Sequence, residues 1–184
     1  MMKLYLLRHG LAAERDPRRF PDDSLRPLTR KGKERIRLLC ASLPAMAGSF
    51  DRVLSSPYRR AAQTAEIVAV TLRLKKRLEF RDELAPGGDS KALVRYVNGL
   101  RPGREKVLLV GHEPDLSRFI SQLISGGPAT AIDMKKGGLA KLVIEGELRY
   151  ARCATLAWLL TPRQMGLMAS VERRTSRPRS VLTR

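Results

Sequence analysis

Short apolar runs that suit buried strands alternate with amphipathic stretches along most of this chain. The runs at 3–7, 51–54, 77–80 and 107–110 have the length of strands, and 107–110 is the clearest. The segments between them carry apolar residues at helical spacing. Strands that alternate with helices predict a layered α/β fold with a mostly parallel sheet. In such a sheet, ligands bind beyond the carboxyl ends of the strands.

Several residues with strong positional preferences mark the ends of the predicted helices. Thr29 is expected to cap the first helix, and Pro44 to end it. Ser56 and Pro57 supply an N-cap and a first-turn proline for the second helix. Gly32 lies inside the first helix, where it marks either a close backbone approach or a plain surface position.

After residue 138 the pattern changes to two adjacent strands, 139–144 and 148–159, joined by 145–147. A short last helix is expected from Thr161-Pro162. We predict one domain over residues 1–171, followed by a basic, flexible C-terminal tail over 172–184 that holds five arginines.

The charge balance is strongly basic. Lysine and arginine number 36 against 18 aspartate and glutamate, for a formal net charge of +18. Such a charge attracts polyanions, phosphorylated ligands and acidic partners, and it carries no information about fold.

Membrane insertion and zinc or dithiol chemistry have no support in the sequence. No apolar run approaches the roughly 20 residues that span a bilayer, and the opening apolar run is too short for a signal peptide. Cys40 and Cys153 form no CxxC pair, so a reducing cytoplasm is the expected compartment.

The only two histidines, His9 and His112, each follow a predicted strand in a glycine-containing turn. Arg8 precedes the first, and Arg59 and Arg60 begin the helix after the second strand. Arginine forks match phosphoryl oxygens, and a neutral imidazole can attack phosphorus. The pattern therefore favours phosphoryl transfer through a covalent phosphohistidine, with protein cations in place of a metal ion.

Four segments resemble the histidine phosphatase superfamily, the phosphoglycerate-mutase-like group. Residues 7–10 (LRHG) resemble its RHG signature, and residues 55–65 (SSPYRRAAQTA) resemble its SSPxxRAxQTA segment. Residues 28–32 (LTRKG) and 110–112 (VGH) resemble its LTxxG step and its second histidine turn. The likeness covers about residues 2–165. It implies a phosphatase with a three-layer α/β/α sandwich and no cofactor or metal.

The resemblance also implies roles for single residues. His9 matches the nucleophile, and Arg8, Arg60 and His112 match the rest of the phosphate pocket. Arg60 is the match, and not Arg59, because the family arginine directly precedes its alanine. Thr29 either lines the pocket or only caps its helix.

Within the superfamily, the chain resembles the compact SixA-type phosphohistidine phosphatases. Ala12 and Arg15 stand where mutases carry Ser and Asn, and there is no room for their long insertion. Residues 82–88 resemble the branch's ELxPxG stretch, and 136–139 and 160–162 fit its later segments. The implied reaction is removal of phosphate from a phosphohistidine of an acidic partner protein, such as a phosphorelay domain.

The general acid stays open between two carboxylates. Glu83 matches the position used by larger relatives, and Glu113 directly follows His112. A protonated phosphoimidazole carries its own leaving-group proton, so a P–N substrate depends less on an enzyme acid than an ester does.

Two other functions are kept as alternatives. The first is a small-molecule phosphomonoesterase that uses the same pocket for a sugar phosphate or a nucleotide-derived ester. The second is a non-catalytic polyanion-binding protein, which the low aromatic content of 5% disfavours. Non-specific contact of the basic tail with polyanions is a separate expectation.

Overall fold

A computed structural model describes residues 1–100 and 106–175 of the chain. Over these residues, six strands form one sheet in the order β3-β2-β4-β1-β5-β6. The pairings among β3, β2, β4 and β1 are parallel, whereas β5 pairs antiparallel with both β1 and β6. The predicted mostly parallel sheet is confirmed.

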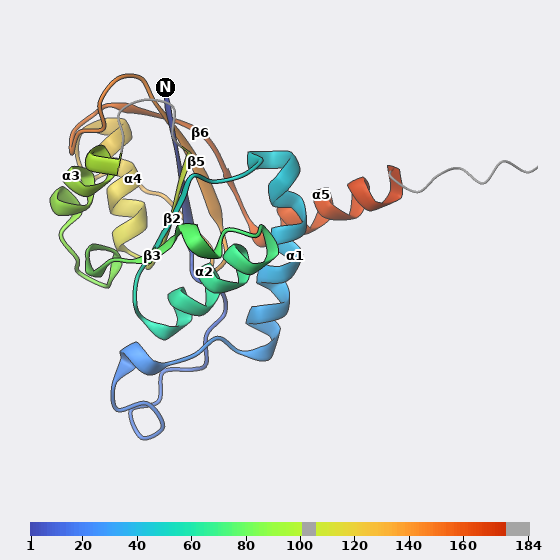
Figure 1. Cartoon of the computed structure of the whole chain (residues 1–184). Helices are drawn as coiled ribbons and strands as arrows, with labels where there is room; N and C mark the ends of the chain where they lie inside the picture. The colour runs from blue at the N-terminus through green and yellow to red at the C-terminus, as the bar shows by residue number, and fades with distance from the viewer. Residues whose placement is uncertain (101–105, 176–184) are drawn as a thin grey trace, which may run out of the picture.

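The elements follow one another in the expected alternation (Figure 1). The strands are β1 (Met2–Arg8), β2 (Arg52–Ser55), β3 (Leu78–Phe80), β4 (Lys106–Gly111), β5 (Leu139–Ile144) and β6 (Ala154–Leu160). The helices are α1 (Arg30–Ala47), α2 (Arg59–Thr71), α3 (Ser90–Leu100), α4 (Asp115–Ser125) and α5 (Pro162–Thr175). Short 3-10 turns are η1 (Asp23–Leu25), η2 (Lys75–Arg77) and η3 (Asp82–Leu84).

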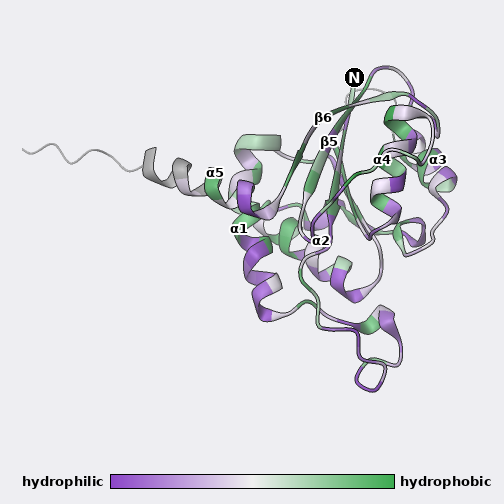
Figure 2. Cartoon of the chain, turned by 180° about the vertical axis from the view of Figure 1, so that it is seen from behind, coloured by the Kyte–Doolittle hydropathy of each residue, from purple (hydrophilic) through white to green (hydrophobic). Residues whose placement is uncertain are grey.

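Helices cover both faces of the sheet, as the three-layer prediction requires (Figure 1). Along β1, Leu4 and Leu6 pack towards α3 and α4, whereas Tyr5 and Leu7 pack towards α1 and α2. Strand β4 alternates in the same way. Because side chains alternate across a strand, a continuous apolar run builds a core on each side. In Figure 2 green, apolar residues run through the strands, and the helices carry both green and purple residues.

The prediction that Pro44 ends the first helix is wrong, because α1 continues to Ala47. The buried Leu43 and Ala47 hold the last turn against the core. The Pro44 carbonyl also accepts the N–H of Gly48, which closes the helix at 2.9 Å. Packing of this turn offsets the helical hydrogen bond that a proline removes.

Ser56 and Pro57 do not open α2, which begins at Arg59 without a side-chain cap. The Ser56 N–H still donates to the Val110 carbonyl of β4 at 2.9 Å. The backbone of Ser56 therefore still pairs with β4, and the residue lies too far before Arg59 to be the N-cap of α2.

The predicted strand 148–159 is also too long, since β6 covers only Ala154–Leu160. The Leu148 carbonyl accepts from Asn98 Nδ2 at 2.8 Å, and the Cys153 N–H donates to the Leu123 carbonyl at 2.9 Å. This segment thus packs against α3 and α4 and not in the sheet. No helix in the described residues is both long and apolar enough to cross a membrane.

Gly32 marks a close backbone approach, the first of the two alternatives. A Cβ at this position would lie 2.0 Å from the Leu11 carbonyl oxygen. Thr29 lies at the same junction: its N–H donates to that carbonyl, and its hydroxyl caps α1 by accepting the Gly32 N–H at 2.9 Å. The start of α1 is thereby tied to the segment that follows His9.

We expect Gly32→Ala to lower the free energy of unfolding by about 2–3 kcal/mol, because backbone must move to admit the methyl group. Gly99→Ala is the control, since nothing lies within 4 Å of a Cβ there. That variant should be neutral or more stable by about 0.5 kcal/mol, as alanine favours helix. Urea denaturation of both variants measures the difference; equal stabilities would contradict the close approach.

Candidate active site

His9 and His112 meet because β1 and β4 are neighbouring parallel strands. Arg8 pairs with Gly111 in the register of the two strands, so each histidine follows at the same sheet edge. The His9 N–H donates to the Gly111 carbonyl at 3.1 Å, and the two imidazole centroids lie 5.0 Å apart. The predicted meeting of the two histidines is present in the structure.

Two arginines complete the cluster. Arg60 stands in the first turn of α2, with 5% of its side chain exposed. Arg8 is held by a hydrogen bond from its Nη1 to the Met134 carbonyl at 2.7 Å. Together with both histidines, these arginines line a pocket of about 410 Å³.

Three nitrogens of this cluster are buried without a hydrogen-bond partner among the described residues. They are Nε of Arg8, Nε of Arg60 and Nδ1 of His112. Leaving a buried polar atom unpaired is costly, particularly on a charged group. Three such atoms around one pocket are suited to a ligand that brings several acceptor oxygens, as a phosphoryl group does.

The hydrogen bonds of His9 fix its tautomer. Its Nδ1 lies 2.7 Å from the Gly10 carbonyl oxygen, which can only accept. Nδ1 therefore carries the proton, and the lone pair of a neutral His9 lies on Nε2. A lone pair on a buried, oriented imidazole is the property that a nucleophile needs.

His112 is oriented by Ser56. The Ser56 Oγ lies 2.8 Å from His112 Nε2 and accepts the Tyr58 N–H at 3.2 Å. When the hydroxyl donates to Nε2, a neutral His112 carries its own proton on the unpartnered Nδ1. His112 can then donate this proton in a hydrogen bond to an anion. Ser56 thus orients His112, whereas the sequence predicted that it would cap α2.

Both imidazoles are neutral at pH 7. Burial lowers the pKa of His9 to about 3; the hydrogen bond with Gly10 opposes this shift, and the positive charges of Arg60, Arg8 and Arg26 add to it. Burial and the neighbouring His9 likewise lower the pKa of His112 to about 3. A neutral His9 keeps its Nε2 lone pair available.

We expect both imidazoles to titrate well below their ordinary value of 6.5. The histidines of the unfolded chain bind protons near pH 6.5, whereas those of the folded chain bind them only near pH 3. The folded protein therefore loses stability as the pH falls from about 6.5 to about 3. Imidazole nitrogen shifts in phosphate-free buffer report this directly, because the chain holds only two histidines. Titration of either ring near 6.5 would contradict the buried, neutral pair.

The sequence did not point to several residues that line the pocket. Asp23 of η1 binds Arg60, with its Oδ2 3.0 Å from Nη2 and its backbone carbonyl accepting from Nη1 at 2.8 Å. Burial favours a higher pKa for Asp23, but the hydrogen bond from Arg26 and the charges of Arg60 and Arg26 outweigh it and lower the pKa. Asp23 therefore holds Arg60 in place as a carboxylate.

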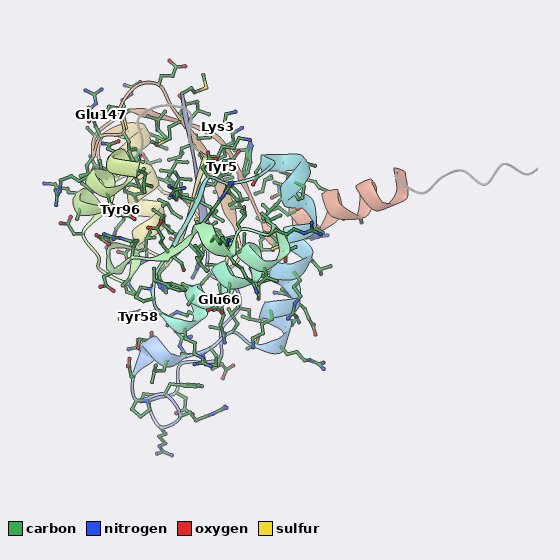
Figure 3. The ribbon with its side chains drawn as sticks, viewed as in Figure 1. Lys3, Tyr5, Tyr58, Glu66, Tyr96 and Glu147 are labelled. Atoms are coloured by element: carbon green, nitrogen blue, oxygen red, sulfur yellow. The ribbon has the colours of Figure 1, made fainter. Side chains whose placement is uncertain are left out.

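The remaining lining residues that sequence reasoning missed are Arg15, Arg26, Tyr58, Pro86 and Lys136. Two of them come from the segment between β1 and α1, which extends beyond the carboxyl edge of the sheet (Figure 1). Tyr58 lies at the start of α2, facing that segment (Figure 3). The segment has no apolar periodicity, so its place at the pocket could have been predicted only from its basic residues, which follow the RHG turn closely in sequence.

Glu83 and Thr29 do not line the pocket. Arg81 holds Glu83 at 2.6 Å, and this hydrogen bond lowers the pKa of Glu83. Glu113 does line the pocket, and burial raises its pKa. Arg59 lines a different pocket, which agrees with the choice of Arg60.

The described residues contain no group of three or more His, Cys, Asp or Glu side chains placed to hold a metal ion. The positive charge around the pocket comes from Arg8, Arg15, Arg26, Arg60 and Lys136. A pocket lined by five positive groups suits an anionic ligand such as a phosphoryl group.

Comparison with known proteins agrees with this geometry. A family model of the histidine phosphatase superfamily (branch 1) matches residues 4–85. The phosphohistidine phosphatase SixA of Escherichia coli is 35% identical over 126 residues, which cover 68% of this chain and 76% of that protein. An uncharacterised protein of Picosynechococcus is 35% identical over 142 residues, or 77% of this chain and 84% of the relative. A solved structure of the protein histidine phosphatase SixA with tungstate matches with a TM-score of 0.73 at 29% identity, covering 88% of this chain and 98% of that one.

Proposed function

This chain belongs to the histidine phosphatase superfamily, and from that premise we propose that it is a SixA-type phosphohistidine phosphatase. It removes a phosphoryl group from a histidine of a partner protein. The observation that carries the proposal is one pocket lined by two neutral imidazoles, whose centroids lie 5.0 Å apart, and by Arg8 and Arg60. Three nitrogens of these side chains are buried and have no hydrogen-bond partner in the described residues. The likeness to SixA proteins supports phosphohistidine as the substrate.

In the first step, the lone pair on His9 Nε2 attacks phosphorus. A P–Nε2 bond forms as the P–N bond of the substrate breaks, and that electron pair returns to the substrate imidazole. A substrate ring that is protonated on its other nitrogen leaves as neutral imidazole without further proton transfer. The phosphorylated His9 ring is cationic, and its Nδ1–H remains bonded to the Gly10 carbonyl.

The charge on the moving phosphoryl group is spread over three oxygens. Arg8, Arg60 and the Nδ1–H of His112 stabilise it, because each has a free donor at the pocket. In the second step, water attacks phosphorus, the P–Nε2 bond breaks, and the bond electrons return to His9. The proton from water passes to a carboxylate or to the departing phosphate.

We assign the proton-transfer role to Glu113 and not to Glu83. Burial raises the pKa of Glu113 and so favours a protonated acid beside the pocket. The hydrogen bond from Arg81 lowers the pKa of Glu83 and keeps that carboxylate charged and occupied. Ester hydrolysis needs this acid, since an alkoxide is a poor leaving group.

We expect Glu113→Gln to lower hydrolysis of a phosphate ester by about a hundredfold, and that of phosphohistidine by much less. Glu83→Gln is the matched control and should change neither rate appreciably. Initial rates of the three proteins on both substrates give the comparison. Equal losses on both substrates, or a loss confined to Glu83→Gln, would contradict the assignment.

Phosphate release from a histidine-phosphorylated phosphotransfer domain tests the proposed function. The domain is compared with a panel of sugar phosphates and nucleotide-derived esters at equal concentration. Preferred release from phosphohistidine is the expected result. Preferred release from one ester would reassign the protein to the small-molecule phosphomonoesterases, and release from neither would favour the polyanion-binding alternative.

The domain boundary, the tail and the compartment stay predictions. Helix α5 reaches Thr175, four residues beyond the expected domain end, and residues 176–184 lie outside the described part of the chain. We propose the cytoplasm as the compartment, where a phosphoprotein partner of this kind meets the enzyme.

A further inference from the structure

A second concave surface adjoins the active-site pocket, between helices α1 and α5. This α1–α5 groove has a volume of about 660 Å³ and includes Arg35 and Leu38 from α1, and Pro162 and Arg163 from α5. The two helices lie side by side in both views of the ribbon (Figures 1 and 2). Arg8 and Lys136 line both the groove and the active-site pocket.

The turn that carries Lys136 fixes the groove to the reaction centre. The Gly137 N–H donates to the carbonyls of Arg8 and His9 at 3.1 Å each. A Cβ at Gly137 would lie 3.3 Å from the Pro162 side chain, so the same turn packs on the start of α5. A molecule seated in the groove is therefore next to whatever His9 attacks.

The groove is cationic and partly apolar. In the described part of the chain, its exposed Arg35, Lys136 and Arg163 form no ion pair, whereas Lys135 is paired with Asp133 at 2.5 Å. None of the lining residues is acidic. Leu38 is 49% exposed and adds an apolar side chain to this cationic lining.

Building on the phosphohistidine phosphatase function proposed above, we propose that the α1–α5 groove docks the acidic protein segment that carries the phosphohistidine. Carboxylates of the partner would pair with Arg35, Lys136 and Arg163, and an apolar partner side chain would cover Leu38. Continuity through Arg8 and Lys136 places the phosphorylated residue at His9. The described lining includes no aromatic side chain on which bases could stack, which favours a protein over RNA.

The double variant Arg35→Glu/Arg163→Glu tests the proposal, because neither residue lines the active-site pocket. The matched control is Lys91→Glu/Arg118→Glu, which changes net charge equally on α3 and α4 across the sheet. Two probes are compared: an acidic phosphotransfer domain phosphorylated on histidine with phosphoramidate, and free phosphohistidine.

We expect the groove variant to lose about tenfold or more in kcat/KM on the domain, through KM, and to keep its rate on free phosphohistidine. The loss should shrink as salt is raised. The control should lose much less on the domain. Equal losses in the two variants would overturn the proposed docking site, because long-range charge attraction alone would then explain the loss. Weakened binding of an RNA oligonucleotide by the groove variant alone, with domain turnover unchanged, would assign the groove to nucleic acid.

This outcome is separable from failure of the proposed function. If the chain is not a phosphohistidine phosphatase, the wild-type protein releases no phosphate from either probe. If only the groove proposal fails, the wild-type protein still turns over the domain, and the groove variant loses no more activity on it than the control variant does.

Discussion

Replacing His9 by alanine is expected to lower kcat/KM for phosphohistidine by about ten-thousandfold or more, because the nucleophile is lost. The neutral Nε2 of His9 is the atom that forms the covalent bond, and its Nδ1 is committed to the Gly10 carbonyl. Phosphate release under subsaturating substrate measures the effect.

His112→Ala is the informative companion, since it removes a donor and leaves the nucleophile. We expect its kcat to fall by about a hundred- to a thousandfold, as when one hydrogen-bond donor to an oxyanion is removed. Circular dichroism shows whether both variants are folded. A His9→Ala protein that is folded and keeps more activity than His112→Ala would contradict the assignment of the nucleophile.

Arg60→Ala is also expected to have a large effect, a loss of about a hundred- to a thousandfold in kcat, comparable to that of His112→Ala. Arg60 is buried beside the pocket and binds Asp23 through Nη1 and Nη2. Removing it takes away positive charge and leaves the Asp23 carboxylate with only Arg26 as an ion-pair partner in the described structure. Steady-state rates and the inhibition constant for inorganic phosphate should both report the change.

The adjacent Arg59 offers a control one residue away. Arg59 is exposed and lines another pocket, so Arg59→Ala should stay within about twofold of wild type. Loss of activity in Arg59→Ala equal to that in Arg60→Ala would mean that overall positive charge, and not the buried guanidinium, is what matters.

The sheet and the central site could be predicted from sequence because they depend on local patterns. A continuous apolar run such as 107–110 suits a strand buried on both faces, and the structure has it in β4. Histidines that follow two neighbouring parallel strands must emerge at one edge, which is why His9 and His112 could be placed together without coordinates.

The sequence could not reveal the side-chain contacts that shape the site. The sequence does not reveal that Ser56 orients His112, a contact across 56 positions in the chain. Nor does it reveal that Asp23 binds Arg60, because η1 lies in a segment without periodicity. Glu83 matched a family position, but its pairing with Arg81 depends on side-chain geometry that a motif does not encode.

The covalent intermediate is the most direct test of the central claim. A phosphohistidine-bearing domain labelled on its phosphoryl group is mixed with excess enzyme, quenched at short times in alkali, and analysed by peptide mass spectrometry. We predict label on His9, acid-labile and absent in His9→Ala, that appears before free phosphate. Label on His112 or Glu113, or a single turnover that releases phosphate with no labelled enzyme at any time, would contradict it.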